Sequence, residues 1–328
     1  MLSCKDQRNM DLEKLDNPLL SLSIPAEFPA MNSAVYANFP TKYGVQLGEK
    51  LFHDKRLSGN NTISCASCHQ QAHAFTDQQA QAIGIENRVG LRNTPPIQNM
   101  AFLQFYNWDG NILQLENQAL VPIITHEEMN SSIVEVMEKL KDDDSYKQLL
   151  TYSFGDGNFS PDRIYKSLAQ YAYSLISANS KYDSVMRMEH PVEFSTQEAR
   201  GFAIFKLKCA SCHRGALFTD QSFRTIGFPI NSHSSEAGRA RVTGKASDQY
   251  SFRVPSLRNV AYTAPYGSFG QFANLMDLLN YLDAGVLESE NLDPYLKNNN
   301  NRIPMSALEK EDIIAFLKTL SDPNFIKK

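Results

Sequence analysis

Two short segments of the 328-residue chain place two cysteines and a histidine at the same spacing. They are Cys65-Ala66-Ser67-Cys68-His69 and Cys209-Ala210-Ser211-Cys212-His213. Cys-x-x-Cys-His is the attachment signature of a c-type haem, because the thiols can bond to the two vinyl groups of one porphyrin. A redox Cys-x-x-Cys pair or half of a zinc site would not require a histidine directly after the second cysteine. We therefore expect two covalent haems, with His69 and His213 as the proximal iron ligands.

The segments on either side of the two motifs are also repeated. Gly48-x-x-Leu51-Phe52 precedes the first motif and Gly201-x-x-Ile204-Phe205 precedes the second, and Phe-Thr-Asp follows each motif. Such internal similarity indicates two copies of one module, each a helix that leads into a haem loop as in a cytochrome c domain. Arg-Asn recurs further along the chain, as Arg92-Asn93 and Arg258-Asn259, and we interpret these two pairs as equivalent positions.

Helix signals dominate the rest of the chain. Helices are predicted to begin near Tyr43, at Ser131 or Ser132, at Ser160-Pro161 (reaching about Ala178), and at the capping boxes that start with Ser195 and Ser306. Strand signals are short and scattered. The sequence therefore predicts a mostly α protein with two cytochrome c-like domains, at 41–190 and 191–328. Residues 1–40, with four prolines after residue 17, are predicted to form an extended leader.

Composition and charge limit the partners and the location. The net charge of −4 argues against nucleic acid as a partner, and no stretch approaches the roughly 20 apolar residues of a membrane span. Cys4 follows Leu2-Ser3 and resembles the lipidated cysteine of a bacterial lipoprotein, but the preceding apolar region is absent. A lipid anchor at Cys4 and a chance match therefore both stay open. C-type haems are attached outside the bacterial cytoplasm, so the periplasmic side is the expected location in either case.

From about Leu47 to Leu320 the sequence resembles the bacterial dihaem cytochrome c peroxidases and their methylamine-utilisation relatives. The shared features are, in order, the two haem motifs, Arg-Asn-x-Pro at 92–95, Trp108-Asp109-Gly110, Gln118 and Glu128. The resemblance implies that the N-terminal haem reacts with peroxide and that the C-terminal haem receives electrons. It also implies that Trp108 lies between the haems, that Gln118 and Glu128 are the distal amide and the acid–base carboxylate, and that Asn93 helps to bind a calcium ion between the domains.

These residue types suit that chemistry. A partly buried carboxylate such as Glu128 can move a proton from the near to the far oxygen of a peroxide. An amide such as Gln118 can orient the peroxide without competing for the proton, and the amide oxygen of Asn93 suits a hard cation. Without the resemblance, the simpler interpretations are an acid near the start of a helix for Glu128, a core residue for Trp108 and a turn residue for Asn93.

Two positions depart from the family pattern. Typical peroxidases of the family carry a histidine that caps the peroxidatic iron until the enzyme is reduced, and that position falls at Ile85, which cannot ligate iron. We therefore predict a first haem that is five-coordinate or water-bound without prior reduction. The family's sixth ligand of the C-terminal haem, a methionine or a tyrosine, falls at Leu282. The neighbouring candidates are Tyr281 and Met276, and a missing or different ligand stays open as well.

Three functions are compatible with these features. We favour a peroxidase that reduces hydrogen peroxide to water with electrons from a small donor protein, a cytochrome c or a cupredoxin. The second is ferryl-dependent oxidation of a protein side chain, as in the methylamine-utilisation relatives, which Ile85 and a tyrosine ligand would favour. The third is a non-catalytic dihaem electron carrier, which would need neither Gln118 nor Glu128. The resemblance is also compatible with a homodimer.

Overall fold

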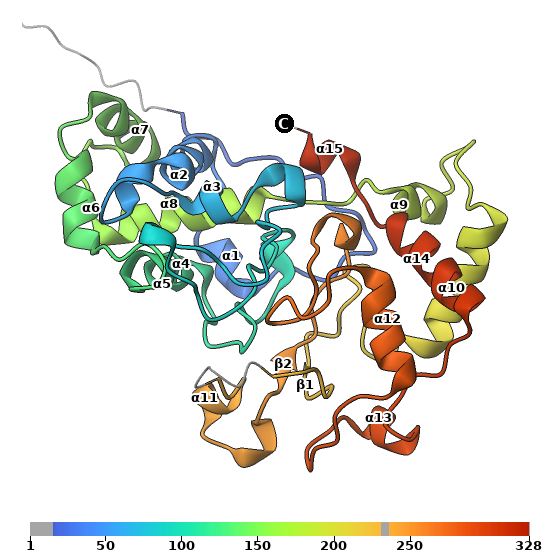
Figure 1. Ribbon diagram of the computed structural model, residues 1–328. Helices are drawn as coiled ribbons and strands as arrows, with labels where there is room; N and C mark the ends of the chain where they lie inside the picture. The colour runs from blue at the N-terminus through green and yellow to red at the C-terminus, as the bar shows by residue number, and fades with distance from the viewer. Residues whose placement is uncertain (1–15, 231–235, 328) are drawn as a thin grey trace, which may run out of the picture.

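Helices account for nearly all of the regular structure (Figure 1). The computed structural model describes residues 16–230 and 236–327, so Cys4, the candidate lipidation site, lies outside the described residues. In the described ranges, the only sheet pairs β1 (Phe223–Arg224) with β2 (Phe252–Arg253) in antiparallel register. No helix in these ranges is long and apolar enough to cross a membrane. The mostly α prediction is confirmed.

Most of the helices are short. The α-helices are, in chain order, α1 (Ser33–Ala37), α2 (Lys42–His53), α3 (Cys65–Cys68), α4 (Leu115–Gln118), α5 (Leu120–Ile124), α6 (Ile133–Leu140), α7 (Asp144–Phe154), α8 (Pro161–Ser174), α9 (Lys181–Met186), α10 (Thr196–Lys208), α11 (Ala240–Thr243), α12 (Leu275–Ala284), α13 (Pro294–Asn298), α14 (Ala307–Lys318) and α15 (Pro323–Ile326). Long irregular loops connect them, and these loops carry most of the candidate site residues.

The predicted helix starts are confirmed. Ser132, Ser160, Ser195 and Ser306 are N-caps, and each hydroxyl accepts a hydrogen bond from the backbone N–H three residues later. Helix α8 ends at Ser174 rather than near Ala178. The reason is that the backbone N–H of Ser177 donates to the side chain of Asn99, and those of Ala178 and Asn179 donate to Asp322, instead of continuing the helix.

In each half of the chain, one glycine allows two helices to cross at close distance. Helix α2 packs against α8, and α10 packs against α14 (Figure 1). A Cβ atom on Gly48 would overlap the carbonyl oxygen of Ser167 in α8, and one on Gly201 would overlap that of Asp312 in α14. The repeated Gly-x-x-apolar-Phe pattern therefore marks the same helix crossing in both halves.

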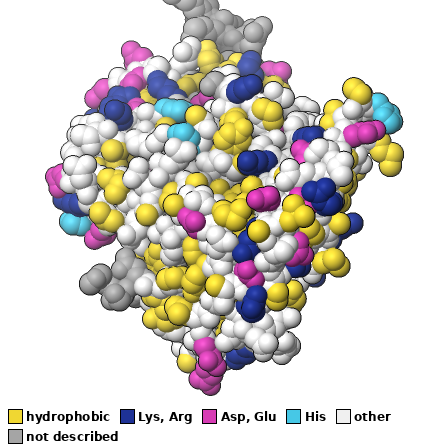
Figure 2. Space-filling model, turned by 45° about the vertical axis from the view of Figure 1, so that its right-hand side comes forward, with side chains coloured by type: hydrophobic (Ala, Val, Ile, Leu, Met, Phe, Trp, Pro, Cys, Tyr) yellow, Lys and Arg dark blue, Asp and Glu magenta, His cyan; other side chains and the backbone are white. Residues whose placement is uncertain are grey.

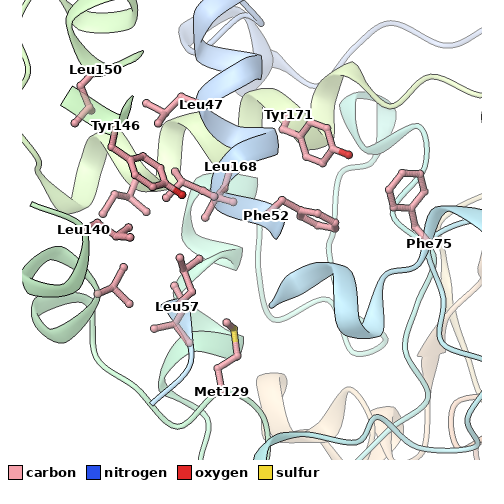
Figure 3. Packing of buried hydrophobic residues seen from close by; sticks show 14 of the residues in the cluster. Leu47, Phe52, Leu57, Phe75, Met129, Leu140, Tyr146, Leu150, Leu168 and Tyr171 are labelled. Atoms are coloured by element: carbon pink, nitrogen blue, oxygen red, sulfur yellow. The ribbon is translucent and has the colours of Figure 1, made fainter. Parts of the chain in front are cut away.

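Each crossing is surrounded by its own hydrophobic cluster. In the first half, Phe52 of α2 lies against Tyr171 of α8, with ring centroids 5.1 Å apart (Figure 3). Phe325 of α15 also joins this cluster, so the end of the chain returns to the first half. In the second half, Phe205 and Phe218 pack around Phe316.

The leader is more structured than an extended segment. Asn32 caps the short helix α1, and its side-chain nitrogen donates to the carbonyl of Leu103. Val35 and Phe28 are buried in a cluster with Phe102. Residues 16–40 therefore contribute to the core of the first half. The sequence did not predict this, because the segment is rich in proline and its hydrophobic residues show no helical or strand periodicity.

The interpretation of Arg92-Asn93 and Arg258-Asn259 as equivalent positions is wrong. Asn99 and Asn259 share a left-handed backbone (φ 56° in both) and each precedes a 3₁₀ turn. The N–H of Asn99 donates to the carbonyl of Leu175 just after α8, and that of Asn259 donates to the carbonyl of Leu320 just after α14. Asn259 therefore corresponds to Asn99. The matching Arg-Asn dipeptides were misleading because the two halves correspond in backbone conformation rather than in these residue types. When Asn99 is aligned with Asn259, Asn93 corresponds to Arg253.

Candidate active site

The first haem motif forms a single helical turn. Cys65 and Cys68 begin and end α3, so their thiols lie one turn apart on one face of the helix. The ring Nδ1 of His69 lies 2.9 Å from the carbonyl oxygen of Phe75 and donates to it. This bond leaves Nε2 without its proton and available for iron, an arrangement typical of histidine ligands. Phe75 adopts a left-handed conformation (φ 62°), which directs its carbonyl toward the ring.

The second motif repeats this geometry. The backbone N–H of His213 donates to the carbonyl of Cys209, as that of His69 donates to Cys65. Nδ1 of His213 lies 3.1 Å from the carbonyl oxygen of Phe218, whose φ is 53°. Burial lowers the pKa of both histidines, which favours the neutral form that binds metal.

Arg253 is a buried cation between the halves and would suit an anion there. Its side chain is buried, and no carboxylate of the described residues lies within 4.0 Å of its guanidinium group. Burial lowers the pKa of Arg253 to about 10. A buried cation is costly without a counter-ion, and the carboxylates of a haem propionate would supply one. The Nδ1 atoms of His69 and His213 are held by backbone carbonyls, and Arg253 could pair with a propionate, so the residues present fit covalent haem.

Glu128 lies beside the first haem motif. The backbone N–H of Ile85 donates to the carbonyl of Glu128 (2.9 Å), and the thiol of Cys68 lies 3.7 Å from the carbonyl oxygen of Ile83. Burial raises the pKa of Glu128 above its ordinary value, and the charge of Glu127 raises it further. The alternative explanation as a helix-start acid is not supported, because α6 begins after its N-cap Ser132 and the acid in its first turn is Glu135.

Ile85, which we predicted to stand at the position of the family's capping histidine, is buried and 2% exposed. It lies in a 3₁₀ turn, Ile85–Asn87, that is bonded to the Glu128 segment. A Cβ atom on the preceding Gly84 would overlap the carbonyl oxygen of Glu127. The loop is therefore packed against the backbone of Glu127 and Glu128, and the side chain that it buries at Ile85 is aliphatic.

Gln118 and Trp108 are linked through one side chain. Gln118 is the last residue of α4, and its Oε1 accepts a hydrogen bond from Nδ2 of Asn107 (2.9 Å). Asn107 directly precedes Trp108, whose indole Nε1 donates to the carbonyl of Asn93 (2.9 Å). Trp108 and Arg253 line the same narrow cavity between the two halves, together with Pro95, Pro96, Gln98, Leu103, Pro255 and Ser256.

A reciprocal pair of backbone hydrogen bonds joins the halves at this point. The N–H of Arg253 donates to the carbonyl of Trp108 (2.8 Å), and the N–H of Asn93 donates to the carbonyl of Ser268 (2.9 Å). Arg253 corresponds to Asn93, and Ser268 occupies the position of Trp108 in the second half. The contact is therefore approximately two-fold symmetric, and only one of its two sides carries an aromatic side chain.

A buried ion-pair cluster lies beside Trp108. Arg92 Nε donates to Glu236 (2.6 Å), and its NH2 group donates to Glu236 and to Asp109 (both 2.9 Å). The side chain of Glu236 is fully buried. Arg239 adds a bond to the carbonyl of Asp109 (2.8 Å). We call Arg92, Asp109, Glu236 and Arg239 the interface cluster, because it fixes the Trp108 segment to the second half.

Asn93, the candidate calcium ligand, is buried. Its side-chain nitrogen donates to the carbonyl of Gln79 (2.7 Å), which orients the side-chain oxygen. The described residues contain no group of three or more His, Cys, Asp or Glu side chains that could hold a metal. A calcium ion at this place would therefore depend on the amide oxygen and on backbone carbonyls.

The candidates for the sixth ligand of the second haem lie on α12. Tyr281 packs in a small cluster with Val286 and Leu292, and its hydroxyl donates to the carbonyl of Gly227 (2.7 Å). Leu282 also packs against the cluster that contains Cys209, whereas Tyr281 does not. The phenol is thus committed to a backbone acceptor. Met276 is half-buried near the start of α12, and the identity of the ligand stays a prediction.

Sequence reasoning missed two residues. Arg253 stands in Phe252-Arg253-Val254-Pro255, a segment noted only as part of the repeat, and a lone arginine carries no signal of burial. Glu236 follows a polar stretch of sequence, and its burial depends on Arg92, which is distant in the sequence. No local pattern could have joined these two residues.

Comparison with known proteins gives consistent results. A family model described as di-haem cytochrome c peroxidase matches residues 42–191. The methylamine utilization protein MauG of Methylophilus methylotrophus is 32% identical over 280 residues, which are 84% of this chain and 81% of that protein. The cytochrome c551 peroxidase of Nitrosomonas europaea is 32% identical over 324 residues, which cover 94% and 92%. The crystal structure of a MauG-like protein associated with microbial copper homeostasis superposes with a TM-score of 0.83 at 28% identity, covering 94% of this chain and 97% of that one.

Proposed function

The chain belongs to the family of di-haem cytochrome c peroxidases, which are oxidoreductases, and on this basis we propose that it reduces hydrogen peroxide to water. Peroxide would react at the N-terminal haem, in the part at 41–190, and electrons would enter through the C-terminal haem, in the part at 191–328. The observation that carries the proposal is the carboxyl group of Glu128, which is partly buried beside the first haem motif with a raised pKa. An electron carrier has no need of such a group.

Glu128 performs the proton transfer. The haem held by His69 supplies, when bound, an iron that binds peroxide and the electrons that cleave its O–O bond. The carboxylate of Glu128 accepts the proton of the near peroxide oxygen and returns it to the far oxygen, which leaves as water. Burial favours this exchange, because it brings the pKa of the carboxyl group closer to neutral pH.

The neighbouring side chains prepare the site. The amide nitrogen of Gln118 donates to the peroxide, since its Oε1 is already occupied by Asn107. Ile85 fills the position of the capping histidine with an aliphatic group, so no protein ligand has to leave before peroxide binds. Trp108, in the cavity between the halves, carries electrons from the second haem to the first.

Several finer assignments complete the proposal. The cofactors are two covalent c-type haems and one calcium ion at Asn93, and the electron donor is a small cytochrome c or cupredoxin. The location is the periplasmic side, where c-type haems are attached. Oxidation of a protein side chain is the second candidate, because buried Ile85 leaves the first haem open and because MauG is among the relatives.

Steady-state turnover of hydrogen peroxide with reduced cytochrome c tests the proposed function. Glu128→Gln is expected to lower kcat by about 10²–10⁴, the usual contribution of a general acid–base group. The absorption spectrum should still show both haems. Glu127→Gln is the matched control, because Glu127 is exposed and adjacent, and it should keep turnover within a few-fold. Normal turnover by Glu128→Gln would contradict the assignment, and absence of turnover in the unmodified protein would favour the second candidate.

A further inference from the structure

The turn that ends α9 carries three soft or borderline metal donors at alternate positions: Met186, Met188 and His190. Met186 is 39% exposed and Met188 is 79% exposed, and His190 is also exposed. The segment between α9 and α10 projects from the molecule (Figure 1). On this projection, at the upper right of Figure 2, histidine and hydrophobic side chains lie together.

The backbone of this turn favours glycine rather than methionine. The N–H of Glu189 donates to the carbonyl of Ser184, and the N–H of Met188 donates to that of Val185. This pair of bonds is the Schellman motif, in which the residue at the place of Met188 is left-handed and usually glycine. Met188 has φ 57°, a conformation that is unfavourable for a residue with a side chain.

Packing does not offset this cost. Among the described residues, neither Met186 nor Met188 joins a hydrophobic cluster. A methionine that is strained and exposed stabilises the fold less than a glycine would. Residues that are unfavourable for their local conformation are expected at functional positions. The thioether of Met188 therefore points to a role other than stabilising the fold.

The residues between these donors neutralise each other. Arg187 Nε lies 2.6 Å from Oε1 of Glu189, and its NH1 group donates to the carbonyl of Ala178 (2.9 Å). The guanidinium group is thereby held by partners and does not oppose a bound cation. The carboxylate of Glu189 is occupied as well, so the donors left on this turn are two thioethers and one imidazole.

We propose that Met186, Met188 and His190 form a binding site for Cu(I). Thioether ligands select Cu(I) among the biological metals, and imidazole is a good copper ligand. Zn(II) would require thiolates or more imidazoles, and Ca(II) would require oxygen donors. The three ligands lie within five residues of one exposed turn, so together they would offer a single ion two sulfur atoms and one nitrogen atom. The site is separate from the haem motifs and does not depend on the proposed peroxidase function.

Copper binding by the full-length holoprotein tests this site. The protein, with Cys4→Ser to remove a competing thiol, is dialysed anaerobically against Cu(I) buffered with bicinchoninate, and copper per chain is measured by atomic absorption. One copper per chain is expected, with sulfur and nitrogen neighbours in X-ray absorption. No bound copper, or binding of Zn(II) but not Cu(I) in parallel samples, would overturn the proposal.

Variants locate the copper. Met186→Leu with Met188→Leu should weaken Cu(I) binding by more than about tenfold, the change that follows from losing 1.4 kcal/mol. Met188→Gly should also weaken binding while the Tm stays the same or rises, since glycine suits the left-handed position. Met137→Leu, a half-buried methionine of α6, is the matched control and should bind as the parent does. Unchanged binding in the double variant would assign the copper to another place and overturn the site.

Discussion

At the scale of single residues, the environment of Glu128 favours the acid–base role that we propose for it. The carboxyl group is partly buried beside the thiol of Cys68, and desolvation is the main cause of its raised pKa. The exposed Glu127 contributes a second, electrostatic cause. Because the two causes are physically separate, one can be removed without the other.

This separation predicts a pH dependence. Glu128 accepts a proton only as a carboxylate, so kcat/KM for peroxide should fall as the pH falls through its raised pKa. Glu127→Gln removes a repulsive charge, lowers the pKa of Glu128 and should move this fall to lower pH. The displacement should be small, because the charge of Glu127 is exposed and solvent screens its effect on Glu128.

The measurement is kcat/KM against pH for the parent and for Glu127→Gln. Glu138→Gln, an exposed acid on α6, serves as the control and should leave the profile in place. A displacement toward higher pH in Glu127→Gln would have the wrong sign for a like-charge effect. That result would show that a group other than Glu128 causes the fall of kcat/KM at low pH.

At the scale of elements, the two helix crossings organise each half. Gly48→Ala should destabilise the protein by about 3 kcal/mol, because the new methyl group overlaps the carbonyl of Ser167 and α2 must move away from α8. Guanidinium unfolding of the holoprotein, followed by circular dichroism, measures the change. Gly157→Ala is the matched control, since its nearest atom would lie 3.2 Å away, and it should cost less than about 1 kcal/mol.

Elements with local signals could be predicted from the sequence, and elements defined by distant contacts could not. The serine caps gave the starts of α6, α8, α10 and α14, because a cap acts within three residues. The end of α8 was missed because it depends on Asn99 and Asp322. The equivalence of Asn99 and Asn259 was missed for a related reason, since a left-handed backbone leaves no fixed mark in the sequence.

The same distinction applies to the candidate site. The haem motifs are contiguous and were evident, and the structure gives both histidines the backbone acceptor that an iron ligand needs. Arg253 and Glu236 become visible only when the halves are assembled, because each is defined by burial against the other half. The sixth ligand of the second haem depends on which face of α12 meets the haem, and its identity stays a prediction.

At the scale of the whole molecule, the two halves are similar modules. They are joined by a contact whose backbone hydrogen bonds are approximately symmetric but whose side chains differ. The backbone bonds of Asn93 and Arg253 are equivalent, but one side carries Trp108 where the other carries Ser268. The interface cluster lies on the Trp108 side. The aromatic side chain and the ion pairs that hold it therefore occur on one side of the contact only.

The interface cluster predicts a coupling between stability and electron transfer. Glu236→Gln leaves the guanidinium group of Arg92 with one carboxylate instead of two, and loss of a partner from a buried ion pair typically costs about 3–5 kcal/mol. Trp108 is then held less firmly, so electron transfer between the haems should slow as well. Guanidinium unfolding and stopped-flow reduction of the first haem through the second measure the two effects.

Two comparisons make this prediction specific to the cluster. Lys166→Met breaks an exposed pair with Asp162 and should cost at most about 1 kcal/mol without changing electron transfer. The double variant Arg92→Met with Glu236→Leu removes both of these charges but leaves the buried carboxylate of Asp109 without its guanidinium partner, so it should not recover the stability lost in Glu236→Gln. Electron transfer should also stay slow in the double variant, because Asp109 has lost its bond to Arg92. Fast transfer with full stability would show that Trp108 is positioned by the backbone bond to Arg253 alone.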